Sequence, residues 1–172
     1  MIRLLSHLER HSISYLLIGG RGLEAHGYVR NTLDLDLLLP LGELGKMRSL
    51  LLDYGYAVVA ETSIFSRWMS SSGENPEIDL LYVDAPTFKK LEADAVSCLF
   101  GETVARVPSV AGMVALKLHA MRNNPDRRPR DLQDIIALRR LHPDAFDLAE
   151  LRALCERYGP AGIFESILSL EP

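Results

Sequence analysis

Two carboxylates lie close together in the segment TLDLDLLLP, residues 32–40. If residues 33–39 form a strand that Pro40 ends, its period of two places Asp34 and Asp36 on one face. Leu33, Leu35 and Leu37 then share the other face. Carboxylates about 6 Å apart repel each other by roughly 3 kcal/mol at an effective dielectric of about 20. A fold rarely places such a pair for stability, whereas carboxylates of this kind bind Mg²⁺.

A diglycine precedes these acids. An apolar run at residues 14–18 reads as a buried strand that ends in Gly19-Gly20. A helix is expected from Arg21 towards Gly27, which would be its C-cap. A glycine break before a helix exposes backbone N–H groups and a positive dipole end, which suits phosphate. A metal ion beside phosphate is therefore the chemistry that this region suggests.

A third acid occurs on a later strand, expected at residues 77–83. Ile78 and Leu80 share one face of it, and Asp79 points the other way. If the two acid-bearing strands are neighbours, Asp34 and Asp36 could bridge two Mg²⁺ ions, with Mn²⁺ as a substitute, and Asp79 could complete one site.

Two ions about 3.5–4 Å apart would stabilise the attacking and leaving oxygens of an in-line phosphoryl or nucleotidyl transfer. Asp79 would also be placed to take the proton of an acceptor hydroxyl. The alternative is structural, because acids on strands can instead pair with arginines.

The remaining pattern predicts an α+β fold with a short mixed β-sheet flanked by helices and a helical C-terminal third. The expected helices are 2–11, 42–53, 86–95, 109–122, 130–141, 147–157 and 160–169, and the other expected strands are 56–60, 64–69, 96–100 and 103–107. Residues 1–108 would form the catalytic core, and residues 109–172 a helical region packed on it, in one compact unit.

Composition limits the class of protein. At 172 residues with 48% apolar side chains, the chain can bury a core. Its net charge of -4 gives no global attraction for nucleic acid. Cys98 and Cys155 are too few for a disulfide framework. With no signal peptide and no apolar run of membrane-spanning length, we expect a cytoplasmic protein without membrane contact.

The motifs together resemble the nucleotidyltransferase superfamily, whose members include DNA polymerase beta. That family has an apolar residue before Gly-Gly or Gly-Ser, then Asp-x-Asp or Asp-x-Glu, then a third acid on a later strand. Here these elements are Ile18-Gly19-Gly20, Asp34-Leu35-Asp36 and Asp79. The resemblance is closest to small prokaryotic nucleotidyltransferase-like proteins and AbiE-type abortive-infection toxins, whose spacer resembles His26-Gly27-Tyr28 with Arg30 and Thr32.

The resemblance implies a nucleotidyltransferase fold and a Mg²⁺-dependent transfer of a nucleoside monophosphate from ATP or another nucleoside triphosphate. It implies that Gly19, Gly20 and Arg21 hold the triphosphate and that Arg30 and Thr32 support the acids. Many active members carry Gly-Ser, whose hydroxyl contacts a phosphate. Here Arg21 follows the diglycine, and a guanidinium is suited to phosphate or to solvent.

A lysine occurs in the otherwise apolar helix expected at 109–122. Lys117 could place its ammonium group in water while its stem packs, or it could reach the triphosphate and neutralise its charge. Asp131 and Asp134 share one face of the next helix, where the helix dipole favours acids without any function. The resemblance adds that a Lys in one helix and Arg-Asp-x-x-Asp in the next recur in the family, and an ion pair between Lys117 and Asp131 would satisfy both interpretations.

The motifs leave three kinds of acceptor open. An RNA 3′ end, a protein hydroxyl and a small molecule are all compatible with the motifs, and an antitoxin or regulator protein is a possible partner. A basic run could position RNA through phosphate contacts, or could simply be solvated. It comprises Arg122, Arg127, Arg128, Arg130, Arg139 and Arg140. A catalytically weak nucleotide-binding or antitoxin-type module of the same fold is the alternative to an active enzyme.

Overall fold

The structure is a computed structural model, and it describes residues 2–73 and 75–170. Contacts between Cα atoms divide the chain into two compact units. Unit 1 comprises Met1–Ala25 and Val29–Pro108, and unit 2 comprises His26–Tyr28 and Ser109–Pro172. The tripeptide His26–Tyr28 therefore packs with residues far from it in the sequence.

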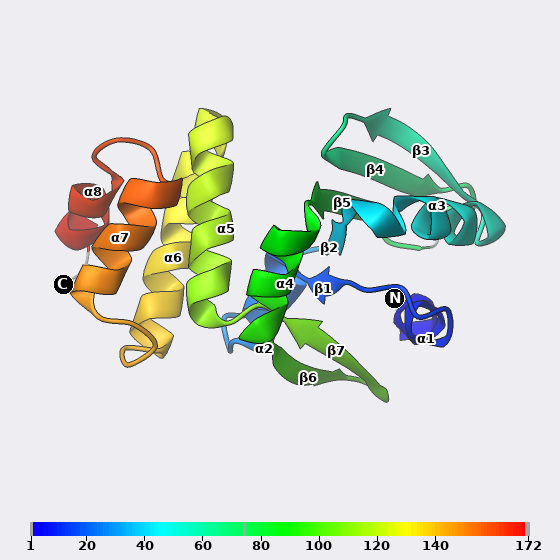
Figure 1. Cartoon of the computed structure of the whole chain (residues 1–172), viewed down its shortest axis with the longest axis horizontal. Helices are drawn as coiled ribbons and strands as arrows, with labels where there is room; N and C mark the ends of the chain where they lie inside the picture. Colours follow the sequence, from blue (N-terminus) through cyan, green and yellow to red (C-terminus); the bar gives the residue numbers. More distant parts are fainter. Residues whose placement is uncertain (1, 74, 171–172) are drawn as a thin grey trace. The chain divides into compact units, whose positions relative to one another are not determined.

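A mixed β-sheet is the centre of unit 1 (Figure 1). Strands β2 and β5 are parallel, and the other neighbours in this sheet are antiparallel. In spatial order, the described strands of this sheet are β1 (Leu16–Leu17), β2 (Leu35–Pro40), β5 (Ile78–Val83), β4 (Phe65–Ser70) and β3 (Tyr56–Glu61). The predicted α+β class with a mixed sheet is confirmed.

The two acid-bearing strands bury their apolar residues, and β5 alternates as its sequence predicts. Ile78, Leu80 and Tyr82 of β5 are buried, while Asp79 is partly exposed on the opposite face. In β2, Leu35 and Leu37 are buried with the apolar residues that follow them. The buried leucines hold the strands in register, because a slip of one residue would expose them.

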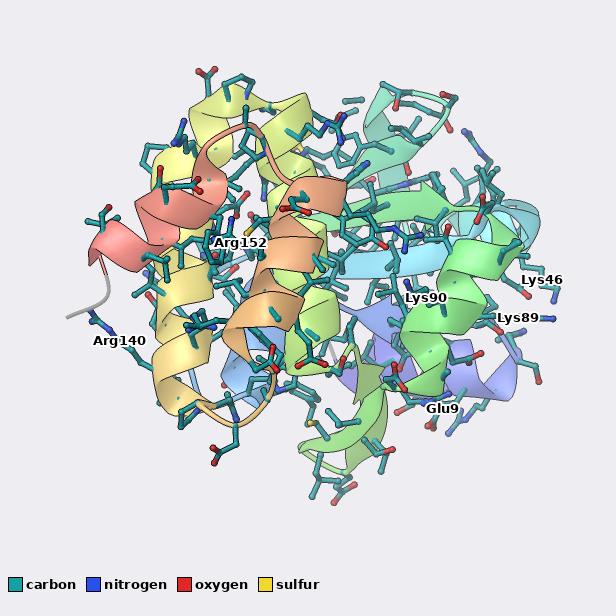
Figure 2. All side chains as sticks on the ribbon, turned by 60° about the vertical axis from the view of Figure 1, so that its left-hand side comes forward. Glu9, Lys46, Lys89, Lys90, Arg140 and Arg152 are labelled. Carbon is teal, nitrogen blue, oxygen red and sulfur yellow. The ribbon has the colours of Figure 1, made fainter. Side chains whose placement is uncertain are left out.

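Helices and a separate β-hairpin complete unit 1. They are α1 (Ile2–Arg10), α2 (Gly19–Ala25), the 3₁₀ helix η1 (Leu41–Glu43), α3 (Leu44–Asp53), α4 (Ala85–Ala93), and the hairpin of β6 (Val96–Phe100) and β7 (Thr103–Val107). Helix α4 begins where the Asp84 side chain accepts a hydrogen bond from the Thr87 N–H. Phe88 of α4 is buried, whereas Lys89 and Lys90 are exposed (Figure 2).

Unit 2 is helical. Its elements are α5 (Val110–Asn123), the 3₁₀ helix η2 (Pro125–Arg127), α6 (Arg128–Leu141), α7 (Leu148–Tyr158) and α8 (Ile163–Leu170). Helix α5 packs against α6 and α7, and α8 packs against the same two helices. Within this unit His142 Nε2 donates a hydrogen bond to the His26 carbonyl oxygen at 2.7 Å. Among the described residues, the structure contains no helix both long and apolar enough to cross a membrane.

Two boundaries near the predicted site differ from expectation. Helix α2 starts at Gly19, so the diglycine is its first turn and not a break before it. Strand β2 starts at Leu35, so Leu33 lies outside the sheet and is 80% exposed instead of buried. The first difference arises because local propensity assigns glycine to turns, while the close contacts of Gly19 and Gly20 described below decide otherwise.

Candidate active site

Two of the predicted acids are direct neighbours in the sheet. Strands β2 and β5 run parallel with Asp36 paired to Asp79, so both carboxylates project from the same face. Asp34 lies immediately before β2, where the Leu35 N–H donates to the Glu77 carbonyl oxygen at 2.9 Å. This bond belongs to the first pair of the two strands, Leu35 and Ile78, and Asp34 and Glu77 are the residues that immediately precede that pair. The structure thus brings the two predicted motifs together.

A cation from the next strand meets these acids. Arg67 of β4 is the cross-strand partner of Asp79. Its Nε and Nη2 donate to Asp79 Oδ1 and Oδ2 at 2.8 and 2.7 Å, which is a bidentate ion pair. These hydrogen bonds and the Asp79 charge raise the pKa of Arg67 above its usual value, and Glu77 and Asp34 contribute further. We call Asp34, Asp36, Glu77, Asp79 and Arg67 the acidic face.

The diglycine lies against this face. An added Cβ on Gly19 would sit 1.9 Å from Asp36 Oδ2, and Gly19 has φ of +60°. A Cβ on Gly20 would sit 2.6 Å from the Thr32 Cβ. Both positions therefore require glycine for close approach, and the first also requires it for backbone conformation. The Ile18 N–H donates to the Asp36 carbonyl oxygen at 3.0 Å, which fixes the start of α2 beside the acid.

The donor chemistry of the acidic face fits a hard divalent cation. Carboxylate oxygens are the ligands that Mg²⁺ prefers, and several carboxylates here face one arginine. Across residues 2–73 and 75–170, however, no three His, Cys, Asp or Glu side chains form a group ready to hold a metal ion. Both Asp79 oxygens accept from Arg67, so a metal at Asp79 would compete with the guanidinium for the charge of this carboxylate. Metal binding by Asp34, Asp36 and Asp79 stays a prediction.

The other residues predicted in unit 1 have local roles. Arg21 donates to Glu24 Oε2 at 2.7 Å on the surface of α2. Thr32 packs on Gly20, and Arg30 is partly exposed in the segment before β2. Arg21 would have to leave Glu24 before it could contact a triphosphate.

Lys117 forms a buried ion cluster within unit 2. Its Nζ lies 2.9 Å from Asp131 Oδ1 and 2.6 Å from Asp134 Oδ2, and its side chain is 6% exposed. Arg127 Nε also donates to Asp131, at 2.9 Å. The expected pair of Lys117 and Asp131 is therefore present, and Asp134 is a second partner. This cluster joins α5 to α6, and with two carboxylates on one ammonium it leaves Lys117 committed to them.

The arginine-rich run makes contacts within unit 2. Arg128 Nη2 donates to Ser166 Oγ at 3.0 Å, and Arg140 Nη2 donates to the Leu170 carbonyl oxygen at 3.3 Å. The Arg139 guanidinium lies 5.5 Å from the Phe146 ring centre. These contacts tie α6 to its surroundings, which gives the run a structural role on its own.

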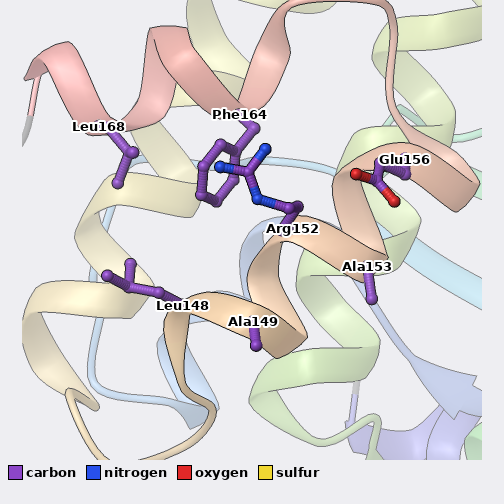
Figure 3. A pocket seen from close by; sticks show the side chains of 7 residues that line it. All are labelled: Leu148, Ala149, Arg152, Ala153, Glu156, Phe164 and Leu168. Atoms are coloured by element: carbon purple, nitrogen blue, oxygen red, sulfur yellow. The ribbon is translucent and has the colours of Figure 1, made fainter.

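A shallow pocket of about 380 Å³ lies between α7 and α8 of unit 2 (Figure 3). Leu148, Leu168 and Phe164 form its apolar lining, and the Arg152 guanidinium stacks 4.0 Å from the Phe164 ring centre. None of the acids of unit 1 lines it, so it offers no metal ligands of the predicted kind.

Arg67 and Glu77 were missed by the sequence analysis. Their signal is the alternation of their strands: Arg67 is two residues from Phe65 and Met69, and Glu77 is two residues before Asp79. Aligning the strands in a sheet places both beside the predicted acids. The order of the strands, which the sequence does not specify, is what brings them there.

Solved structures share this fold. ANT(2'')-Ia, an antibiotic-resistance factor, has a TM-score of 0.66 and 16% identity over 96% of this chain and 89% of that chain. LnuA, a lincosamide antibiotic adenylyltransferase, has a TM-score of 0.59 and 15% identity over 81% of this chain and 94% of that chain. A nucleotidyltransferase-like protein of Paracoccidioides brasiliensis has a TM-score of 0.58 and 17% identity over 98% of this chain and 89% of that chain. The fold is that of a nucleotidyltransferase.

The sequence itself defines the family. Residues 70–163, more than half of the chain, match the family described as nucleotidyl transferase AbiEii toxin, type IV toxin–antitoxin system. The chain therefore belongs to the AbiEii nucleotidyltransferase family. The matched region contains Asp79, Lys117 and Asp131, and it begins after Asp34 and Asp36. No curated protein matches the chain.

Proposed function

We propose that this protein is a metal-dependent nucleotidyltransferase that moves a nucleoside monophosphate from a nucleoside triphosphate to a hydroxyl acceptor. The observation that carries the proposal is the pairing of Asp36 with Asp79 on parallel strands, with Gly19 packed on the Asp36 carboxylate. Family membership and the shared fold support the same reaction class.

Asp34, Asp36 and Asp79 would hold Mg²⁺, which when bound neutralises phosphate charge and promotes loss of the acceptor proton. In the reaction, the acceptor oxygen bonds to the α-phosphorus and the bond to pyrophosphate breaks. The Asp79 carboxylate accepts the proton of the acceptor hydroxyl. The start of α2 at Gly19 and Gly20 would bind the phosphates through backbone N–H groups, which the first turn of a helix leaves without intrahelical partners.

The direct test is transfer of label. The protein is incubated with α-labelled ATP, GTP, CTP or UTP, Mg²⁺ and total cellular RNA, total protein or a small-molecule extract. We expect label in one pool and equimolar pyrophosphate release. Asp36→Asn should abolish both, with an unchanged circular dichroism spectrum as the control for folding. Equal labelling by Asp36→Asn would contradict the proposal.

A role as the toxin of a type IV system is the biological form of this proposal, because the family carries that description. Induced expression should arrest growth, and Asp36→Asn should not. The pool that takes up label in the transfer assay identifies the class of cellular target. Growth arrest by Asp36→Asn equal to that by the wild type would separate toxicity from transfer.

The second candidate function is nucleotide binding without turnover. It is favoured by the ion pair between Arg67 and Asp79, which occupies both Asp79 oxygens, and by the commitment of Lys117 to two acids. Titration calorimetry with ATP and Mg²⁺, run beside a pyrophosphate assay, distinguishes the two. Binding without pyrophosphate release in the presence of every acceptor pool favours the second function.

A further inference from the structure

The acidic face contains its own cation. Arg67 neutralises carboxylates that would otherwise repel one another across β2 and β5. It is fixed there by the sheet, since it is the cross-strand neighbour of Asp79. Its two hydrogen bonds of 2.8 and 2.7 Å use both oxygens of that carboxylate.

We propose that Arg67 is a positioning residue that acts as a tethered competitor of the metal ion: it holds Asp79 until a divalent cation displaces it. The inference rests on the proposed metal-dependent function. A metal bound at Asp79 would share a carboxylate oxygen that already accepts from Arg67, and the positive charges of the metal and the guanidinium would repel each other. Metal binding at Asp79 is therefore an exchange of a guanidinium for a cation, and its affinity is set by both.

The geometry allows this exchange. The Arg67 side chain is 44% exposed, whereas that of Asp79 is 16% exposed. The arginine can thus move into solvent while the aspartate stays in place. The Arg67 guanidinium carbon also lies 5.9 Å from the centre of the Phe65 ring, two residues earlier on the same strand. That ring provides a cation–π surface close to where a displaced guanidinium would move.

Such an arrangement affects both the order of the carboxylates and their affinity for a metal ion. Without Arg67, the charges of Asp34, Glu77 and Asp79 would repel one another, which disfavours their ordered placement. Arg67 keeps the acids ordered before the metal arrives. It also raises the cation concentration at which the site fills, because every binding event must break a charge-assisted ion pair.

Mn²⁺ affinity measured without nucleotide tests this directly. Electron paramagnetic resonance counts free Mn²⁺ in titrations of the full chain. Arg67→Gln should bind Mn²⁺ about three- to fivefold more tightly than the wild type, because a partly exposed charge-assisted pair no longer competes. Arg67→Lys, which keeps the charge but not the bidentate geometry, should fall between them.

Arg106→Gln is the matched control. Arg106 also pairs with an acid of unit 1, Glu92, at 3.1 Å and is 42% exposed. Removing it changes the net charge equally but leaves the acidic face intact, so Mn²⁺ affinity should be unchanged. A gain in Arg106→Gln equal to that in Arg67→Gln would show a general charge effect and overturn the inference.

The outcomes separate this inference from the proposed function. Asp79→Asn should lose Mn²⁺ binding. If it does, while Arg67→Gln and Arg67→Lys bind as the wild type does or more weakly, the competitor role is wrong and the metal site stands. If neither the wild type nor Arg67→Gln binds Mn²⁺, the metal-dependent function is wrong and the inference falls with it. Arg67→Lys supplies the comparison if Arg67→Gln does not fold.

Discussion

The two units each contain an arrangement of cations and carboxylates, and the two arrangements differ in exposure. In unit 1, Arg67 and Asp79 are a partly exposed pair on a sheet face. In unit 2, Lys117 is buried between Asp131 and Asp134. The chemical groups are similar, but water reaches only the first.

This difference separates a replaceable contact from a permanent one. An exposed ion pair contributes about 0–1 kcal/mol, so another cation can displace it. Removing one partner from a buried cluster leaves an uncompensated charge and costs about 3–5 kcal/mol. Motif resemblance treats Asp79 and Lys117 as site residues alike, whereas the structure shows a partly exposed carboxylate at the first and a buried ammonium between two carboxylates at the second.

The largest expected effect is that of Asp79→Asn on transfer. The change removes a metal ligand and the proton acceptor, and we expect a loss of about 10⁴-fold in pyrophosphate release under kcat/KM conditions. Its free energy of unfolding in urea should change by less than about 1 kcal/mol. A large loss of stability with only a small loss of transfer would show that the pair of Arg67 and Asp79 is structural, as the cluster of Lys117 is.

The next effect is that of Lys117→Met on stability. Methionine matches the stem of lysine but leaves Asp131 and Asp134 without the ammonium, so urea unfolding should show a loss of about 3–5 kcal/mol. Arg157→Met is the control, because it removes a cation from the surface of unit 2. Normal stability with lost nucleotide binding in Lys117→Met would instead favour a contact between Lys117 and the nucleotide.

Gly19→Ala should lower stability by about 2–4 kcal/mol. Its Cβ would overlap the Asp36 carboxylate, and alanine at φ of +60° is strained. Gly55→Ala isolates the backbone strain from the steric overlap, because Gly55 has φ of +75° with no atom within 4 Å of the added Cβ. It should lose only about 1–2 kcal/mol. Equal losses would mean that Asp36 moves aside at no cost.

The smallest effect is the salt response. A double-mutant cycle of Arg67→Gln and Asp79→Asn should give a coupling energy of about 0.2–1 kcal/mol in low salt. At 0.5 M NaCl this coupling should fall by more than half, because the pair is open to screening ions. The stability loss of Lys117→Met should be nearly the same at both salt concentrations. A salt-independent coupling would make Arg67 a poor competitor.

The alternation of apolar residues predicted most of the helices and strands, including both acid-bearing strands. The start of α2 was misassigned because glycine has a poor helix propensity, while close approach to Asp36 and Thr32 excludes any side chain there. The pairing of Lys117 with Asp131 was expected from the family resemblance, in which a lysine in one helix and Arg-Asp-x-x-Asp in the next recur. The pairing of Arg67 with Asp79 depends on which strands are neighbours, and no local pattern contains that information.

The tripeptide His26–Tyr28 has a consequence for how such proteins can be recombined. The chain leaves unit 1 after Ala25, returns after Tyr28 and leaves again after Pro108. His26 is buried, and its carbonyl oxygen accepts from His142. Exchanging the helical part between relatives at a single junction near residue 108 would therefore leave this tripeptide with a foreign partner. A functional chimera therefore needs His26–Tyr28 and Ser109–Pro172 to come from the same parent.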